Sequence, residues 1–262
     1  MNKRLMFSAV LVMALLSANA QKRAFTIEDL YRVKGVSSVS LSPDGKTVCY
    51  TASSSDLKNQ KSGSDIYIMN ADGSHTKALT EDGKSSSAVW SKDGKSIFFT
   101  NYEKGTAQIF RMDLTTCETE QVTDYELGIG SPVISPDERF IAFTAEVYPD
   151  LGADAKANKA RMEKKEQGPV QAHIADKLLY RHWTSYSDGR CNHLILFDTQ
   201  TKTYKDLTPG NYSLIFVVGG GITYQFSPDS KEICFVSNHD EHQEASTNAD
   251  LWTVSVNGGE PV

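Results

Sequence analysis

The stretch "LLYRHWTSYSDG" at 178–189 collects side chains that can bind a ligand. The guanidinium of Arg181 can hold a carboxylate or a carbonyl oxygen, and Trp183 and Tyr186 can form an apolar wall beside it. Alternatively, Tyr180 and Trp183 pack this stretch onto a neighbouring sheet, with Arg181 stacked on an aromatic ring. The sequence favours packing, because aromatic residues lie more often in cores than in sites, but it leaves both interpretations open.

A second candidate is "NHDEHQE" at 238–244, where His239, Asp240, Glu241 and His242 offer metal-ligating atoms. His-x-x-His beside acids is compatible with a zinc site. The stretch lies between two predicted strands, however, where a solvated loop is the ordinary outcome. Acidic residues elsewhere lack the dense oxygen spacing of a calcium loop. We therefore predict no metal and no cofactor.

Hydrolysis by a serine nucleophile would need a Gly-x-Ser-x-Gly elbow with an acid and a histidine. No serine of this chain has glycine at both flanking positions of that motif. The glycine-rich "VVGGGITY" at 217–224 precedes a strand and not a helix, so it is no phosphate loop. We predict that this chain contains no catalytic residue.

One repeated unit must position these residues. Its opening is a polar turn followed by an apolar strand, as in "SPDGKTVCYT" from Ser42, with further copies from Ser91, Ser135 and Ser227. Its closing is a second hairpin, as in "DIYIMNADGSHTKALT" from Asp65, with further copies from Gln108, His193 and Asp250. Asp-Gly between alternating hydrophobic residues is a strong hairpin signal. The repeats predict an all-β fold, a partial β-propeller of about four antiparallel four-stranded blades.

The blades are expected at about 35–80, 88–123, 131–208 and 222–262, after a short helical segment at 21–34. Opening and closing of the third blade are 58 residues apart, against 17 to 23 in the other blades. This difference predicts an insertion at 147–190, and long insertions often form lids or binding loops.

The insertion has a composition of its own. Residues 153–167 are rich in helix-forming Ala, Lys, Glu and Arg, which predicts a solvated helix ended by Gly168-Pro169. "KLLYRHW" at 177–183 is then expected to return as a strand.

The first twenty residues predict a secretory signal. Lys3 and Arg4 precede an apolar run, and Ala18-Asn19-Ala20 supplies the small-x-small cleavage pattern. The run is too short to span a membrane. We expect cleavage after Ala20 and an exported, periplasmic protein.

Net charge and cysteine use narrow the function further. Loss of the signal changes the formal charge from −6 to −8, which argues against nucleic-acid binding. No basic amphipathic segment suggests a membrane contact beyond export. Cys49, Cys117, Cys191 and Cys234 form no C-x-x-C pair, so free and mostly buried thiols are favoured over a bridge.

Three stretches carry a family resemblance. The repeats resemble those of TolB-like proteins and of the prolyl oligopeptidase clan, and "FTIEDLYRVKGVSSVSLSPDGKTVCYT" resembles the start of secreted S9 serine peptidases. "ADKLLYRHWTSYSDGRCNHLILFD" resembles the third-blade segment of the dipeptidyl peptidase 5 and acylaminoacyl-peptidase branch. The resemblance covers nearly all of the mature chain, but only the front of the family's length.

The resemblance implies a propeller stacked on a C-terminal α/β-hydrolase domain that carries the Ser, Asp and His triad and is absent here. The propeller is then expected to control access of peptide substrates and to help hold the substrate's N-terminus. Glu146 is a candidate for the substrate ammonium, and Arg181 could orient it. Since the chain stops inside a predicted strand, we expect an N-terminal fragment of a longer peptidase, for which the resemblance allows a homodimer.

Two alternatives remain open. A TolB-like periplasmic propeller would act as a protein-binding module and would lack peptidase activity. A propeller with its own small-molecule site is the third hypothesis.

Overall fold

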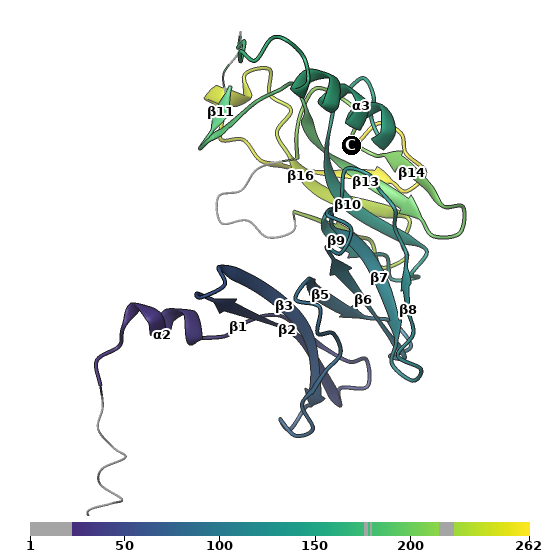
Figure 1. The fold of residues 1–262 in the computed structure, drawn as a ribbon. Helices are drawn as coiled ribbons and strands as arrows, with labels where there is room; N and C mark the ends of the chain where they lie inside the picture. Colours follow the sequence, from purple (N-terminus) through teal and green to yellow (C-terminus); the bar gives the residue numbers. More distant parts are fainter. Residues whose placement is uncertain (1–22, 176–177, 179, 215–222) are drawn as a thin grey trace, which may run out of the picture.

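The computed structural model describes residues 23–175, 178, 180–214 and 223–262. The predicted signal peptide at 1–20 and residues 217–222 of the glycine-rich stretch lie outside the described residues. Four sheets follow one another in chain order, and the strand pairs within each are antiparallel (Figure 1). The all-β partial propeller predicted from the repeats is confirmed.

Each sheet is one blade. The first blade consists of β1 (Gly35–Leu41), β2 (Thr47–Asp56), β3 (Lys61–Asn70) and β4 (Lys77–Ala78). The second consists of β5 (Ser85–Trp90), β6 (Ser96–Asn101), β7 (Gln108–Asp113) and β8 (Thr119–Gln121). The third consists of β9 (Gly130–Ile134), β10 (Phe140–Val147), β13 (Cys191–Asp198) and β14 (Thr203–Asp206). The fourth contains β15 (Tyr224–Phe226), β16 (Glu232–Ser237) and β17 (Asp250–Ser255).

The fourth blade departs from the predicted four strands, because its sheet has three within the described residues. Val262 nevertheless exchanges two backbone hydrogen bonds with Thr253 of β17, at 2.8 and 3.0 Å. Val262 therefore lies beside the third strand, as the fourth strand does in the other blades.

The opening turns explain why the repeat is visible in the sequence. In each turn a serine hydroxyl donates to the aspartate two residues later, at 2.6–2.7 Å, and accepts the backbone N–H five residues later, at 2.9–3.1 Å. The pairs are Ser42–Asp44, Ser91–Asp93, Ser135–Asp137 and Ser227–Asp229. Because these bonds are local, the same few residues build the same turn in every blade.

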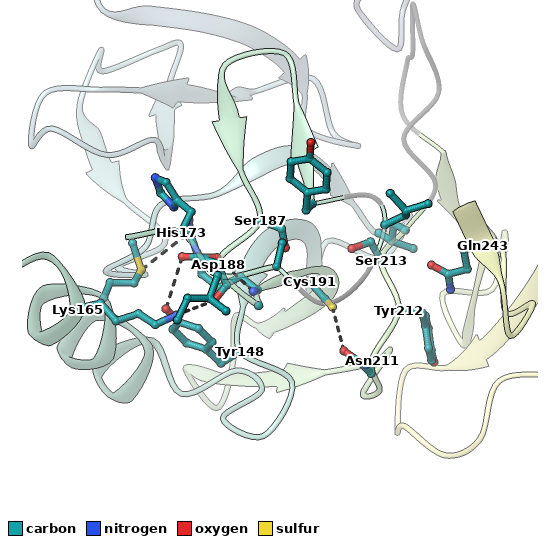
Figure 2. A pocket seen from close by; sticks show the side chains of 18 of the residues that line it. Tyr148, Lys165, His173, Ser187, Asp188, Cys191, Asn211, Tyr212, Ser213 and Gln243 are labelled. Atoms are coloured by element: carbon teal, nitrogen blue, oxygen red, sulfur yellow. Dashed lines mark hydrogen bonds and ion pairs between the residues drawn. The ribbon is translucent and has the colours of Figure 1, made fainter. Parts of the chain in front are cut away.

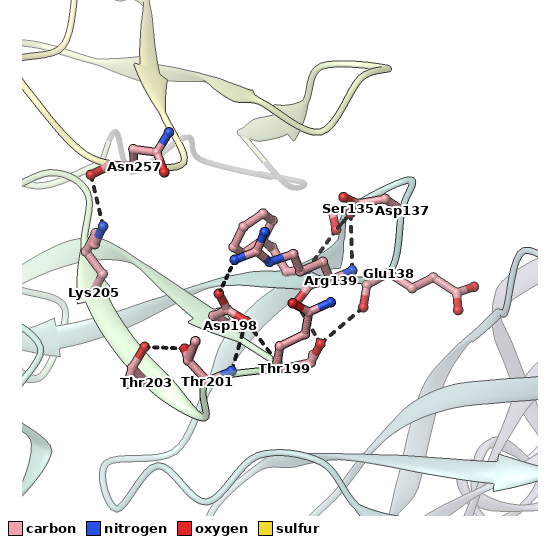
Figure 3. A network of polar contacts seen from close by, with 12 residues as sticks. Ser135, Asp137, Glu138, Arg139, Asp198, Thr199, Thr201, Thr203, Lys205 and Asn257 are labelled. Atoms are coloured by element: carbon pink, nitrogen blue, oxygen red, sulfur yellow. Dashed lines mark hydrogen bonds and ion pairs between the residues drawn. The ribbon is translucent and has the colours of Figure 1, made fainter.

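The opening turns form one edge of the propeller, which we call the turn rim: residues 42–46, 91–95, 135–139 and 227–231. Neighbouring turns contact each other there, since the Asp137 N–H donates to the Ser230 hydroxyl at 3.1 Å. Beside this contact, Arg139 pairs with Asp198 at 2.9 Å (Figure 3). The turn rim is thus stitched within and between blades.

The opposite edge, which we call the loop rim, carries the connections between the second and third strands: residues 57–60, 102–107, 148–190 and 238–249. Alternation of antiparallel strands places these connections away from the turns. The long ones belong to the third and fourth blades.

The hydrophobic core lies between blades. Ile66 and Phe99 belong to the cluster that joins the first two blades, and Phe143 to the cluster that joins the second and third. Leu194 and Phe235 belong to the cluster between the third and fourth blades. Each blade is therefore held by its neighbours as much as by its own ladder.

The insertion begins after β10 and ends at β13, and these two strands pair in continuous register from Phe140 with Asp198 to Val147 with Cys191. Strand β10 also pairs with β9, so both of its edges are occupied. The prediction that 177–183 returns as a strand holds at Arg181–His182 among the described residues, and this strand does not join the blade. The described part of 177–183 forms only β11 (Arg181–His182), which pairs with β12 (Ser185–Tyr186) in a small ribbon.

Both predicted helices are present. Helix α2 (Ile27–Arg32) begins after Thr26, whose N–H donates to the Asp29 carboxylate at 2.9 Å. Helix α3 (Ala155–Glu166) lies in the insertion and ends before Gly168. A short 3-10 helix, η2 (Gln243–Ala245), lies in the fourth blade's long loop. Within the described part of the chain, no helix is long and apolar enough to cross a membrane.

The four cysteines are free thiols, but the expectation that most are buried was wrong. Cys49 is fully buried between the first two blades. Cys117 is exposed in a hairpin turn, while Cys191 and Cys234 are partly exposed. Strand β16 alternates between buried and partly exposed side chains, and Cys234 falls at a partly exposed position.

Candidate functional site

A cavity of about 1770 Å³ opens on the loop rim between the insertion and the loop 238–249. Figure 2 shows Tyr148 and Lys165 on one side and Tyr212 and Gln243 on the other. Ligand pockets commonly measure about 300–1,000 Å³, so the space suffices for a short peptide.

The insertion helix is clamped to the third blade at the base of the cavity. The guanidinium of Arg161 lies 4.6 Å and the ammonium of Lys165 5.2 Å from the centre of the Tyr148 ring. Arg161 also binds Asp150 through two hydrogen bonds of 2.7 Å. Cation–π contacts and a bidentate ion pair together fix the orientation of α3.

A buried asparagine completes this clamp. Asn158 is fully buried on α3 and accepts the Tyr148 N–H at 2.6 Å. Its amide donates to the carbonyls of Gly152 and Asp154 at 3.0 and 2.8 Å. These bonds satisfy a buried side chain and backbone groups at the helix start, so this part of the insertion is structural.

Two carboxylates share one guanidinium where the insertion rejoins the blade. Arg190 Nε donates to both oxygens of Asp188, at 3.0 and 2.8 Å, and its Nη1 lies 3.2 Å from the Glu146 carboxylate. Lys165 Nζ donates to the backbone carbonyl of Asp188 at 2.7 Å. The three side chains carry a formal charge of −1, and Asp188 and Arg190 line the cavity.

Glu146 was predicted from the sequence as an ammonium-binding residue with Arg181 orienting it. The structure pairs Glu146 with Arg190, and the role of Arg181 stays a prediction. The Glu146 side chain is 64% exposed, which leaves its other oxygen accessible. Pairing across β10 and β13 brings residues 146 and 190 together, and no local pattern in the sequence announces it.

Arg181, Trp183 and Tyr186 lie on the ribbon of β11 and β12, beyond the residues that line the cavity. Arg181 and Tyr186 are register partners, with the guanidinium 5.9 Å from the ring centre. Tyr186 also stacks on His173, with ring centres 4.2 Å apart. Their role in substrate binding stays a prediction.

The alternative, in which aromatic residues pack this stretch onto the blade, was wrong for two of them. Trp183 lies at the tip of the ribbon and is 84% exposed, and Tyr180 is 47% exposed. Tyr180 lines the cavity instead. The ribbon extends away from the blade because β10 has no free edge to receive it.

The second wall contains the histidine motif at 238–244. The His239 ring lies between Tyr212 and Trp252, with ring centres 3.8 and 4.0 Å apart. Burial lowers the pKa of His239, and the charge of Asp250 opposes this only in part. Among the residues that the structure describes, no group of three His, Cys, Asp or Glu side chains is placed to hold a metal ion.

A buried charged pair supports this wall from behind. His193 on β13 is fully buried, with Nδ1 2.7 Å from the Asp206 carboxylate and Nε2 3.0 Å from the Gly210 carbonyl. Burial lowers the pKa of an imidazole, but the hydrogen bond and charge of Asp206 outweigh burial and raise the pKa of His193 to about 9. Sequence reasoning missed this residue, although the repeat places it level with Asp65 and Gln108.

Two family models match the sequence. The model described as the TolB beta propeller domain matches residues 16–167, more than half of the chain. The chain belongs to the TolB β-propeller domain family. The model described as the N-terminal region of dipeptidyl peptidase IV matches residues 152–262, which include most of the cavity walls of this TolB-type propeller.

Individual relatives agree with these models. The TolB-type propeller is similar to dipeptidyl-peptidase 5 of Porphyromonas gingivalis, with 28% identity over 231 residues that cover 86% of this chain and 33% of the relative. The acylaminoacyl peptidase of Pyrococcus horikoshii has a TM-score of 0.62 at 17% identity, covering 89% of this chain and 33% of that one. TolB of Acinetobacter baumannii has a TM-score of 0.51 at 20% identity, covering 84% and 41%.

These matches confirm the resemblance seen in the sequence. This TolB-type propeller corresponds to the propeller region of S9 peptidase-like proteins, dipeptidyl-peptidase 5 among them. The chain spans about a third of the length of the curated relatives it matches.

Proposed function

We propose that this chain is the gating and substrate-access portion of an exported serine exopeptidase that releases dipeptides from peptide N-termini. Two relatives named dipeptidyl-peptidase 5 support the reaction class. The observation that carries the proposal is the cavity on the loop rim, bounded by a fixed helix and an exposed ribbon. The catalytic Ser, Asp and His belong to a hydrolase domain outside this chain.

The walls of the cavity suit short, extended peptides. Arg161 and Lys165 hold α3 in place, so the mouth of the cavity keeps its width near the blade. Folded proteins exceed the available space, while an unfolded segment of a few residues fits. Arg181, Trp183 and Tyr186 on the ribbon then supply a cation and an apolar wall to the peptide as it enters.

The substrate's ammonium group is expected at Glu146 and Asp188. Arg190 compensates one of the two negative charges and the Lys165 ammonium lies beside the Asp188 carbonyl, so the exposed oxygen of Glu146 is where a substrate ammonium would bind. A charge-assisted hydrogen bond contributes about 1.5–3 kcal/mol, which corresponds to about 10- to 100-fold in affinity.

The full-length gene product tests this assignment. It should release dipeptides from peptides with a free N-terminus, spare N-acetylated peptides and lose activity with a serine-directed phosphonate. Glu146→Gln and Asp188→Asn should each raise KM about tenfold or more, whereas Glu163→Gln on the exposed side of α3 should not. Residues 21–262 alone should hydrolyse nothing; hydrolysis by them would contradict the proposal.

A TolB-like protein-binding module is the second candidate. The family match over 16–167 and the fold likeness to TolB favour it. It predicts a full-length product without peptidase activity that is captured by a periplasmic protein partner. Absence of both dipeptide release and phosphonate labelling would decide for this candidate. Cell fractionation tests the expected export, and light scattering tests the expected homodimer of the full-length protein.

A further inference from the structure

Residues 207–214 leave the third blade after β14 and form part of the cavity wall; we call them the blade linker. Leu214 of this linker donates to the Asn192 carbonyl at 2.9 Å and bridges Ser237 of the fourth blade. The blade linker therefore lies between two blades, and its position sets the shape of the cavity's second wall. Two histidines hold it, and they do so in different charge states.

The first histidine holds the blade linker at Gly210. A carbonyl oxygen accepts hydrogen bonds and cannot donate them, and the same is true of an ionised carboxylate. His193 reaches the Gly210 carbonyl with Nε2 and the Asp206 carboxylate with Nδ1, so both ring nitrogens must carry a proton. The contact is complete only when the ring is an imidazolium.

The second blade makes the same contact without a titratable histidine. Gln108 stands at the repeat position of His193, and its Nε2 donates to the Tyr125 carbonyl at 2.8 Å, on the linker to the third blade. A polar residue at this position therefore anchors a linker in more than one blade. Only in the third blade is that anchor an imidazole.

The second histidine holds the blade linker at Tyr212, two residues away. The His239 ring stacks on Trp252 and lies tilted by 43° against Tyr212, and its Nε2 is buried with no hydrogen-bond partner among the described residues. A proton added at a buried nitrogen without an acceptor is unfavourable. This contact therefore favours the neutral ring.

Gly210 couples the two contacts. Its backbone has φ +147°, and a Cβ there would collide with the Tyr212 ring. Because Gly210 and Tyr212 touch, movement at one end of this short stretch disturbs the other. Neither contact can be released alone without cost to its neighbour.

We propose that His193 and His239 form a latch on the blade linker that is closed only between two pH limits, with His193 charged and His239 neutral. The inference stands independently of the peptidase function. The groups that face the two rings are few: Asp206 on β14 and Cys191 on β13 face His193, and Asp250 on β17 and the Tyr212 phenol face His239, with Glu260 and Asp206 near that phenol.

The two limits follow from the direction of each shift. The pKa of His193 is raised to about 9, so its contribution is complete below the ordinary value near 6.5 and is lost as pH rises through about 9. The pKa of His239 is lowered by burial, so its contribution is present above about 6.5 and is lost as pH falls through its folded value. The latch is therefore tightest near pH 6.5, where neither contribution has been lost.

Hydrogen exchange at the amides of the blade linker, corrected for the intrinsic effect of pH, tests the latch in the full chain. Protection should be greatest near pH 6.5. It should fall by up to about tenfold per pH unit between about pH 6.5 and about pH 9, and fall again as pH drops below about 6.5. His239→Phe keeps the ring stack without the nitrogen, so it should abolish the acid limb and keep the alkaline one. His193→Gln should abolish the alkaline limb.

His75→Phe in the first blade is the control and should keep both limbs. Trp252 fluorescence gives a second readout, since protonation of the stacked His239 should change it in the wild type and not in His239→Phe. A flat profile in the wild type would overturn the latch. So would an acid limb that survives in His239→Phe, which is informative even if the His193→Gln variant fails to fold.

Discussion

The turn rim connects the first and second strands of each blade, and the loop rim connects the second and third. Every connection on the turn rim has five residues and the same serine–aspartate bonds. The connections on the loop rim range from residues 57–60 to residues 148–190, and the two long ones depend on contacts between side chains far apart in the sequence. One rim therefore has its stability distributed over four equivalent turns, while the other concentrates it in a few anchors and leaves the remaining residues free for ligands.

Loss of the anchor His193 on the loop-rim side should cause the largest loss of stability. His193→Leu should lower the free energy of unfolding by about 3–5 kcal/mol, because the largely buried Asp206 loses its charged partner and, among the described residues, keeps only the hydrogen bond from the Thr208 N–H. Urea denaturation at pH 7 measures the loss. The double variant with Asp206→Leu should recover part of it, and a loss below about 1 kcal/mol for the single variant would show that this anchor is dispensable.

Loss of the serine in a single turn should reduce stability less than loss of His193. Ser135→Ala removes the acceptor of the buried Phe140 N–H and should lower the free energy of unfolding by about 1–3 kcal/mol. Ser54→Ala, an exposed serine near the end of β2 on the loop rim, is the matched control and should stay within about 0.5 kcal/mol. Equal effects at both serines would contradict the distinction between the rims.

Loss of the clamp on the insertion helix should reduce stability less than loss of a turn serine. Arg161→Ala removes a partly exposed ion pair and the contact with Tyr148, and should lower the free energy of unfolding by about 1 kcal/mol. Hydrogen exchange should rise in α3 and not in the blades. Lys156→Ala, on the same helix, serves as the control.

The exposed ribbon should contribute least to stability. Trp183→Ala should change the free energy of unfolding by less than about 0.5 kcal/mol, because the side chain is largely exposed. In the full-length protein it should nevertheless raise KM for peptides. An unchanged KM would show that the ribbon does not contact the substrate. Unfolding of the variant would contradict the prediction that Trp183 contributes little to stability.

The blades could be predicted from the sequence because their turns are local. Ser135 and Asp137 bond each other within one turn, so the motif and the structure coincide. Helix α3 could be predicted for a similar reason, since its residues favour a helix one by one. The small extent of the strand within 177–183 could not be predicted, because strands distant in the sequence, β9 and β13, already pair with β10.

The site was harder to predict than the fold. Glu146 stays a predicted substrate contact, and its partner Arg190 lies 44 positions later and reaches it only through strand pairing. His239 was interpreted as a metal ligand or loop residue, whereas aromatic rings from two other segments determine its role. A comparison of the closing hairpins could have singled out His193, which stands where other blades carry Asp65 and Gln108.

The register of β10 with β13 makes the third blade a ready acceptor of foreign sequence. Val147 and Cys191 are partners, so the insertion begins and ends at positions only about 5 Å apart. The backbone ladder from Phe140 to Val147 is complete at the edge of the insertion. Ala153 and Ala155 of the insertion pack against the core between the second and third blades, so a foreign segment exchanged for residues 156–187 should leave the blade intact if these two contacts are kept, which would turn this propeller into a scaffold for engineered recognition.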